Sequence, residues 1–212
     1  MTDRVTTRKR ELVEAGYKVF RTKGYRTAGV ADIVREAGVS HGTFYNYYDS
    51  KRHILDDVLD YAVEIIISGA VGDSREATSY EELTEQFRAM LNRLLAVAEA
   101  NPGLVQFTML DAPAIDNELV QRLLTLISTF GVLASGYLEN GVRRGFLPAG
   151  LDTKIVGEGL LSLMMSSVIP TLRGAMTEDE RTRHVDTLVD FAFKGMAARP
   201  VVPQQNDASV LE

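Results

Sequence analysis

Apolar residues recur at helical spacing through most of this 212-residue chain, and this periodicity constrains the fold more than any other feature. Val30, Ile33, Val34 and Ala37, for example, stand at i, i+3, i+4 and i+7, which places them on one face of a helix. No segment alternates apolar and polar residues in the way of a half-buried strand. We therefore predict an all-α protein with about nine helices.

Capping residues and helix breakers give approximate boundaries for these helices. Thr6 or Thr7 is expected to cap the first helix, and good N-caps for later ones are Ser40, Ser79, Asn101 (followed by Pro102), Asp116 or Asn117, Asp152 and Thr177. Gly38 and Gly145 are expected to end helices. The expected helices cover about residues 7–24, 30–38, 40–47, 50–70, 79–100, 101–112, 116–145, 152–170 and 177–198.

Charge is distributed unevenly along the chain. Residues 1–53 contain 11 basic and 6 acidic residues, a formal charge of 11 − 6 = +5, whereas the whole chain carries −6 at pH 7. The other 159 residues therefore carry −6 − 5 = −11. This asymmetry indicates that the N-terminal part meets an anion and that the rest does not.

Several classes of protein are disfavoured. The chain has no cysteine, and its three histidines (at 41, 53 and 184) are too scattered to suggest a metal site. No arrangement of catalytic residues stands out, so we expect neither an enzyme nor a cofactor. The N-terminus lacks the apolar segment of a secretory signal. Apolar runs such as residues 160–165 fall short of the ~20 residues of a membrane helix, so we expect a cytoplasmic protein without membrane contact.

The second and third predicted helices, separated by residues 37–40, have the layout of a helix-turn-helix. Gly38 gives the turn a permissive backbone, Val39 fills the angle between the helices and Ser40 caps the second of them. The second helix of such a pair enters the major groove of DNA. The spacing therefore predicts a DNA-reading helix at about residues 40–47.

Four aromatic residues fall within five positions of that helix, in the sequence GVSHGTFYNYYDSK of residues 38–51. The i, i+4 spacing puts Phe44 and Tyr48 on one face, which we predict is buried. The other faces carry side chains that can reach base edges or phosphates: His41, Thr43, Tyr45, Asn46 and Tyr47. Gly42 allows close approach of the backbone.

Lys51 lies in the first turn of the next helix, where the helix dipole disfavours a cation. A phosphate contact at that helix N-terminus would explain its position. We therefore add Lys51 to the predicted DNA-facing residues.

A set of residues at fixed spacing within 8–55 points to a known family. They are Leu12, Ala15, Phe20, Lys23-Gly24-Tyr25, Asp32-Ile33, Ala37-Gly38-Val39-Ser40, Gly42-Thr43-Phe44-Tyr45, Tyr48, Lys51 and Leu55. In this combination the segment resembles the DNA-binding domain of the TetR family of bacterial transcriptional regulators. The chain length and the nine-helix prediction fit that family as well.

The resemblance implies that the third helix reads the operator. By position, His41, Gly42, Thr43 and Asn46 would approach bases, and Tyr45, Tyr47 and Lys51 would hold phosphates. One departure concerns the start of the second helix, where the family usually has a Thr/Ser pair with a phosphate-binding hydroxyl. This chain has Ala28-Gly29 there, so either Thr27 takes that role one position early or the contact is lost.

The resemblance also implies a ligand cavity among the fourth to eighth helices and a dimer built by the last two helices as a four-helix bundle. Gly157 and Gly159 would allow close helix approach in the dimer. The cavity candidates, each of which is more often a core residue, are Phe87, Met90, Phe107, Met109, Tyr137 and Met164. The dimer candidates are Ile155, Leu160, Leu163, Leu188 and Phe191.

These expectations define a domain plan and a function. Residues 1–50 are predicted to form the helix-turn-helix DNA-binding domain, 51–198 the ligand-binding and dimerisation domain, and 199–212 a disordered tail. The predicted function is that of a repressor that binds a near-palindromic operator as a homodimer and is released by a small, largely apolar effector. The alternative is a helical DNA-binding scaffold or interaction protein without a ligand switch.

Overall fold

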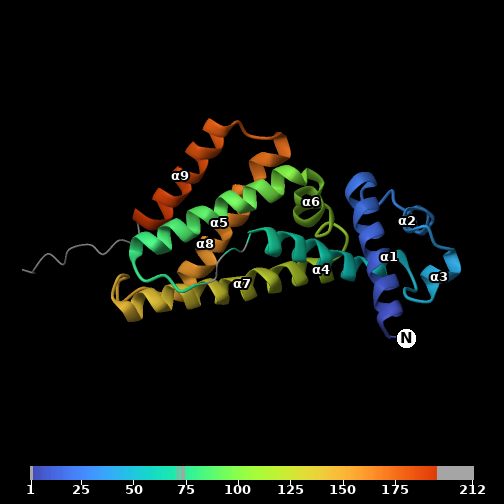
Figure 1. Cartoon of the computed structure of the whole chain (residues 1–212), viewed down its shortest axis with the longest axis horizontal. Helices are drawn as coiled ribbons and strands as arrows, with labels where there is room; N and C mark the ends of the chain where they lie inside the picture. Colours follow the sequence, from blue (N-terminus) through green and yellow to red (C-terminus); the bar gives the residue numbers. More distant parts are fainter. Residues whose placement is uncertain (1, 71, 73–74, 195–212) are drawn as a thin grey trace, which may run out of the picture.

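The structure, a computed structural model, describes residues 2–70, 72 and 75–194. Within these residues every regular element is a helix, so the all-α prediction is confirmed. A π-helical turn (η1) and a 3-10 turn (η2) accompany nine α-helices (Figure 1). The elements are α1 (Thr2–Lys23), α2 (Val30–Ala37), α3 (His41–Tyr45), α4 (Lys51–Ala70), α5 (Tyr80–Ala100), α6 (Pro102–Gln106), η1 (Phe107–Asp111), α7 (Asn117–Arg144), α8 (Thr153–Ser167), η2 (Ile169–Arg173) and α9 (Glu178–Lys194).

Local capping explains most of these boundaries. The side-chain oxygens of Ser40, Ser79, Asp116 and Asp152 each accept a hydrogen bond from the backbone amide three residues on, at 3.0–3.1 Å. Such a bond satisfies one of the free amides of a helix N-terminus. Gly38 ends α2 with a φ of 66°, in the left-handed region where a side chain would be strained.

Two predicted helix boundaries are wrong, and one predicted cap residue makes a different side-chain contact. Helix α1 begins at Thr2, before the expected caps Thr6 and Thr7. Helix α3 ends at Tyr45, because residues 46–47 form a turn that leads into α4. The Asn101 side chain does not cap α6 but binds the Arg21 guanidinium at 3.2 Å, which ties α5 to α1. Helix α9 is described to Lys194, and the predicted tail 199–212 lies outside the described residues.

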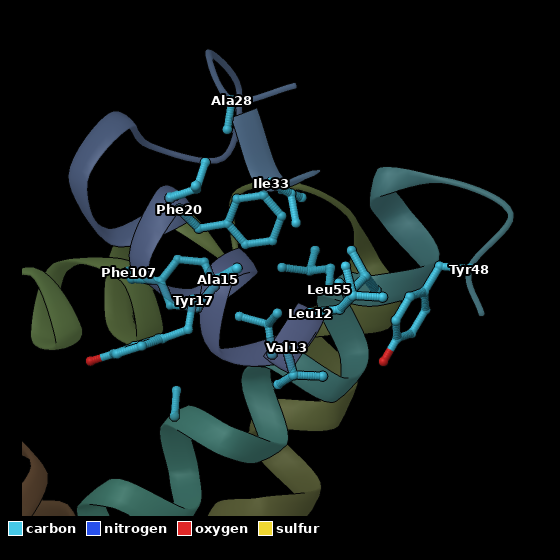
Figure 2. Packing of buried hydrophobic residues seen from close by; sticks show 14 of the residues in the cluster. Leu12, Val13, Ala15, Tyr17, Phe20, Ala28, Ile33, Tyr48, Leu55 and Phe107 are labelled. Carbon is cyan, nitrogen blue, oxygen red and sulfur yellow. The ribbon is translucent and has the colours of Figure 1, made fainter. Parts of the chain in front are cut away.

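The first hydrophobic cluster joins the three N-terminal helices to α4. Leu12 and Phe20 of α1 converge on Ile33 and Leu55, and all four side chains are fully buried (Figure 2). Phe107 of η1 completes the cluster from the C-terminal part, with its ring centroid 6.0 Å from that of Phe20. Burial of each large side chain contributes about 1.5–3 kcal/mol, so this cluster fixes the N-terminal helices against α4.

The second cluster lies among the C-terminal helices. Helix α9 packs against α5, and the Phe193 ring lies 5.4 Å from the Phe87 ring between centroids. Ion pairs of Arg88 with Asp186 and of Arg181 with Glu99 link the same two helices. Figure 1 shows α1–α3 at one end of the molecule and α9 toward the other, with α4 leading from the first group into the second.

Helix α8 folds back along α7, and two glycines set their separation. A Cβ added at Gly157 would lie 2.8 Å from the Gly131 carbonyl oxygen and 2.8 Å from the Ser135 amide nitrogen. A Cβ at Gly131 would lie 2.8 Å from the Glu158 side chain. The expectation that Gly157 serves a dimer contact is therefore wrong, because this residue makes a close approach within the chain.

Two helical stretches, Asn117–Arg144 and Thr153–Arg173, are long and apolar enough to cross a membrane by length and composition alone. The expectation from the sequence concerned uninterrupted apolar runs, which stay short because small and polar residues interrupt both stretches. Most of their residues are not buried within the described chain. Their exposed apolar side chains include Leu124, Val132, Leu133, Tyr137, Ile155 and Ile169.

Gly157→Ala is expected to lower the free energy of unfolding by about 1–3 kcal/mol, because the new methyl group would clash with the backbone of α7. Gly136→Ala is the matched control, since a Cβ at Gly136 meets nothing within 4 Å on the same helix pair. That control should be neutral or stabilising by up to about 1 kcal/mol. Urea denaturation measures both, and equal effects of the two substitutions would contradict the close α7–α8 approach.

Candidate nucleic-acid interface

The turn between α2 and α3 holds the second helix of the pair in a defined direction. The amide of Val39 donates to the Val34 carbonyl oxygen at 3.0 Å, immediately after the left-handed Gly38. The Ser40 hydroxyl then accepts the Thr43 amide at 3.1 Å and lies 3.0 Å from the Thr43 hydroxyl. Helix α3 therefore begins at a position fixed by backbone bonds on both sides of the turn.

The aromatic cluster of α3 divides into two faces, as the spacing predicted. Phe44 and Tyr48 are buried, with ring centroids 5.7 Å apart. Tyr45 is 54% exposed. Tyr47 is only half-buried and packs partly against the first cluster. The inner face thus anchors α3, and the outer face is free to meet a partner.

Most of the predicted DNA-facing residues lie on the surface. His41, Gly42 and Asn46 are exposed, and Thr43 is half-buried beside Ser40. Thr27 is exposed in the loop before α2. The α2 N-cap is Gly29, which has no side chain with which to cap the helix. Its amide donates to the Asp32 carboxylate at 3.1 Å.

Lys51 has a structural role that the sequence did not predict. Its Nζ donates to the carbonyl oxygens of Tyr25 at 2.8 Å and of Ala28 at 2.7 Å, and lies 4.3 Å from the Tyr25 ring centroid. These bonds account for a cation at the α4 N-terminus without any phosphate. An ammonium group has three donors, so the predicted phosphate contact stays a prediction.

Tyr48 is held by a polar contact at its buried edge. Its hydroxyl donates to the Asp57 carboxylate at 2.7 Å, and Lys9 Nζ lies 2.8 Å from the same carboxylate. Burial alone would raise the pKa of Asp57, but the Lys9 and Tyr48 hydrogen bonds lower it overall. Burial raises the pKa of Tyr48. This contact connects α1 and α4 to the segment that follows α3.

Basic residues of α1 and α2 are largely engaged in surface ion pairs. Lys23 and Arg35 both approach Asp32, at 2.6 and 3.3 Å, and Lys18 approaches Glu36 at 2.5 Å. The Lys23 hydrogen bond, followed by that from the Gly29 amide, lowers the pKa of Asp32. Exposed pairs of this kind contribute about 0–1 kcal/mol each, so an incoming phosphate can displace them at small cost.

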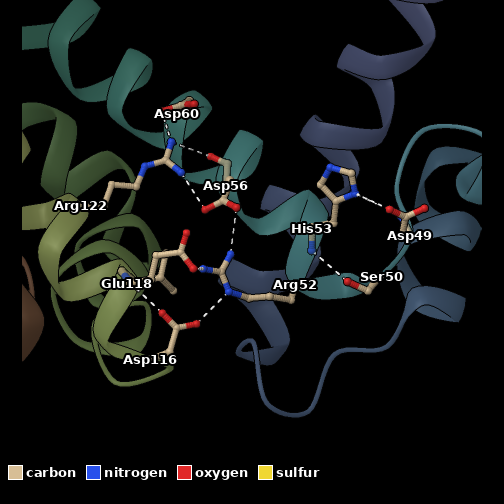
Figure 3. Close-up of polar contacts among 10 residues, drawn as sticks. Asp49, Ser50, Arg52, His53, Asp56, Asp60, Asp116, Glu118 and Arg122 are labelled. Carbon is tan, nitrogen blue, oxygen red and sulfur yellow. Dashed lines mark hydrogen bonds and ion pairs between the residues drawn. The ribbon is translucent and has the colours of Figure 1, made fainter.

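A group of charged residues that we name the α4–α7 ion cluster lies between helices α1–α3, here called the reading head, and the C-terminal part (Figure 3). Arg52 contacts Asp116 at 2.8 Å, Asp56 at 3.0 Å and Glu118 at 3.1 Å. Arg122 contacts the other oxygen of Asp56 at 2.8 Å and also pairs with Asp60. The cluster comprises Arg52, Asp56, Asp60, Asp116, Glu118 and Arg122.

Asp116 has two functions in this cluster. Its Oδ1 caps α7 by accepting the Leu119 amide at 3.0 Å, while its Oδ2 accepts from Arg52. The Leu119 amide and then the Arg52 guanidinium lower the pKa of Asp116. The sequence indicated the cap and contained the Arg52/Asp56 pair at i, i+4, but no local signal pointed to their connection across 64 residues.

The six predicted cavity residues do not form one group, although Phe87, Met109 and Met164 share the second cluster. Phe107 belongs to the first cluster beside Phe20, and Phe87 packs on Phe193. Met109 and Met164 pack against the second cluster, and Met90 is half-buried on α5. Tyr137 is 37% exposed on α7.

The five predicted dimer residues also differ in environment. Ile155 and Phe191 are 66% and 72% exposed. Leu160 and Leu188 pack against the second cluster, and Leu163 is half-buried.

Comparison with known proteins gives results that agree with the predicted helix-turn-helix regulator. The sequence model of bacterial regulatory proteins of the tetR family matches residues 12–58. The HTH-type transcriptional repressor KstR2 of Rhodococcus jostii (strain RHA1) is 30% identical over 156 residues, which cover 70% of this chain and 72% of that protein. The fatty acid metabolism regulator protein of Bacillus subtilis (strain 168) is 23% identical over 159 residues, 74% of this chain and 80% of that protein.

The fold is also that of solved structures. The transcriptional regulator FadR from Bacillus subtilis, solved in complex with stearoyl-CoA, superposes with a TM-score of 0.71. The superposition covers 88% of this chain and 98% of that one, at 19% sequence identity. At this identity the superposition establishes the arrangement of helices only.

Tyr45→Phe is expected to weaken binding to an operator fragment about fivefold, because a hydroxyl–phosphate hydrogen bond is worth about 1 kcal/mol. The substitution keeps the ring, which packs edge-on against Phe44, so stability should not change. Tyr137→Phe, on exposed α7, is the matched control and should bind like the unchanged protein. Fluorescence anisotropy measures the affinity of both variants for DNA. Equal affinities would show that the Tyr45 hydroxyl makes no contact with DNA.

Proposed function

The chain belongs to the TetR family of bacterial regulatory proteins, and from this premise we propose that it represses transcription as a dimer until a small effector releases it from its operator. The observation that carries the proposal is the exposed polar face of α3, held by the buried Phe44 and Tyr48. A rigid helix with this face outward is suited to the major groove.

Each DNA contact follows from its place on this surface. His41, Gly42, Thr43 and Asn46, in and just after α3, are assigned to base edges. Tyr45, Tyr47 and Lys51 are assigned to phosphates, together with Thr27 in the loop before α2. The positive charge of residues 1–53 supports this orientation, since phosphate contacts supply much of the affinity for DNA.

We propose a long-chain acyl-CoA thioester as the effector. Two observations support this class: a similar protein is named a fatty acid metabolism regulator, and a protein of the same fold was solved with stearoyl-CoA. Half-buried apolar side chains of the second cluster, such as Met109, Val156, Leu160 and Met164, can rearrange around an acyl chain. Methionine suits such a role because it is flexible and polarisable.

Helix α4 is the proposed path from effector to DNA. Its C-terminal residue Ala70 is buried in the second cluster, while Ile54 and Leu55 near its start are buried in the first. The α4–α7 ion cluster makes a second connection at the same helix. An effector that repositions α7 would shift α4 and thereby the two α3 helices of a dimer. A hundredfold release of DNA requires about 2.7 kcal/mol of coupling.

The dimer is assigned to the outer faces of α8 and α9. Along α8 and into η2 an exposed stripe runs through Ile155, Gly159, Ser162, Ser166 and Ile169, whose small central residues allow close helix approach. Phe191 on α9 is the most exposed of the large apolar side chains. Leu160 and Leu188 serve the protomer's own core, so we place them behind the interface.

We place the protein in the cytoplasm and assign it no catalytic activity, in keeping with a regulatory family whose target is DNA. The alternative of a ligand-independent scaffold is not favoured, because the two similar proteins described above are named as a repressor and as a metabolic regulator.

Stearoyl-CoA is expected to weaken operator binding about a hundredfold, and free coenzyme A, which lacks the acyl chain, should leave the affinity unchanged. The operator is first obtained by footprinting of bound genomic DNA, and anisotropy titrations then measure the affinity with each compound. If acyl-CoAs of every chain length leave a tight operator complex intact, the effector class is wrong.

Ile155→Asp and Phe191→Asp are each expected to convert the dimer to monomers at micromolar concentration, because a buried unpaired carboxylate is costly. Leu124→Asp is the matched control, an exposed leucine on α7 outside the assigned interface. Sedimentation velocity measures the three variants. Dissociation of the dimer by Leu124→Asp alone would show that the interface lies on α7 and not on α8 and α9.

A further inference from the structure

A surface pocket lies where the chain passes from α8 into α9. Its volume is about 510 Å³. Pro170 and Arg173 of η2 and Met176 of the following loop form one side, and Arg183, His184 and Leu188 of α9 form the other. This volume lies within the range of about 300–1,000 Å³ that small-molecule sites occupy. The pocket contains none of the six predicted cavity residues.

The pocket has an excess of positive charge. Arg173 and Arg183 both line it and both are exposed, and neither guanidinium forms an ion pair within the part of the chain that the structure describes. Most other arginines of the described C-terminal helices are paired, such as Arg88 with Asp186 and Arg122 with Asp56. Two unpaired arginines beside one hollow are suited to an anion.

Glu180 is the carboxylate among the lining residues, and it is already engaged. It accepts the Thr177 amide at 2.9 Å and the Thr177 hydroxyl at 3.0 Å, as the capping-box partner of the α9 N-cap Thr177. These two bonds lower the pKa of Glu180. These bonds partly satisfy the negative charge of Glu180, so this carboxylate offsets the positive charge of the two arginines only in part.

His184 also lines the pocket, but its Nε2 does not face it. Its Nε2 is buried and has no hydrogen-bond partner within the described residues. A buried polar atom without a partner costs about 1–3 kcal/mol, so such atoms are usually satisfied by protein, water or a bound molecule. A ligand in the open pocket does not reach this buried Nε2, so recognition of an anion there rests on the two arginines.

We infer that this pocket binds the phosphate groups of an organic phosphate whose apolar part packs on Met176, Leu188 and Pro170. Arginine binds phosphate through two parallel hydrogen bonds, and two arginines supply more donors than one carboxylate can accept. The inference deepens the proposed function and rests on it for the choice of ligand, because an acyl-CoA carries such phosphates on its nucleotide.

The test is calorimetric titration of the full chain with free coenzyme A. The variant Arg173→Gln/Arg183→Gln should bind at least about tenfold more weakly than the unchanged protein. Both side chains are exposed, so the fold should be kept, and a thermal melt checks this. Arg143→Gln is the matched control, an exposed arginine on α7 outside the pocket, and should bind within about twofold of the unchanged protein.

Pyrophosphate should displace coenzyme A from the unchanged protein, because the pocket recognises the phosphates rather than the adenine. Absence of coenzyme A binding, equal binding by the double variant, or failure of pyrophosphate to compete would overturn the inference.

The DNA-release assay separates this result from the proposed function. If stearoyl-CoA fails to release DNA while the double variant loses coenzyme A binding, the pocket stands and the effector class is wrong. If stearoyl-CoA releases DNA and the double variant binds coenzyme A normally, the effector class stands and the pocket is wrong.

Discussion

Helix α4 belongs to both hydrophobic clusters, and the rest of the structure depends on this shared burial. Ile54, Leu55 and Val58 are fully buried against α1–α3, whereas Ala70 is buried among the C-terminal helices. Ile66 packs against both clusters. Packed cores change between discrete arrangements rather than deforming continuously, and this is why α4 is the proposed path between the two clusters.

The polar contacts around α4 set its position more than they add stability. In the α4–α7 ion cluster, Asp56 is shared by Arg52 and Arg122, and these arginines are only partly exposed. Lys51 holds two carbonyl oxygens of the α1–α2 loop from the first turn of the same helix. Surface pairs of this type have small net energies, but several that converge on one helix restrict how it can move. The reading head thus has one defined orientation on α4.

Local sequence signals predicted helices well where the deciding atoms are close in sequence. Ser40, Ser79, Asp116 and Asp152 cap helices by bonds that span three residues, so their residue types were sufficient evidence. The division of the α3 aromatics followed from i, i+4 geometry for the same reason. The prediction failed for Gly157, and the Asn101 side chain contacts Arg21 instead of capping α6; in both cases the partner lies far along the chain.

The sequence by itself therefore determined the all-α class, most helix ends and the buried and outward faces of α3, because each depends on backbone geometry within a few residues. Only the tertiary structure decided that Phe107 joins the reading-head core, that Gly157 contacts α7, and that Arg173 and Arg183 meet at one pocket. These outcomes depend on which helix faces meet. That choice is made by the packing of the whole chain, and no local pattern of residues encodes it.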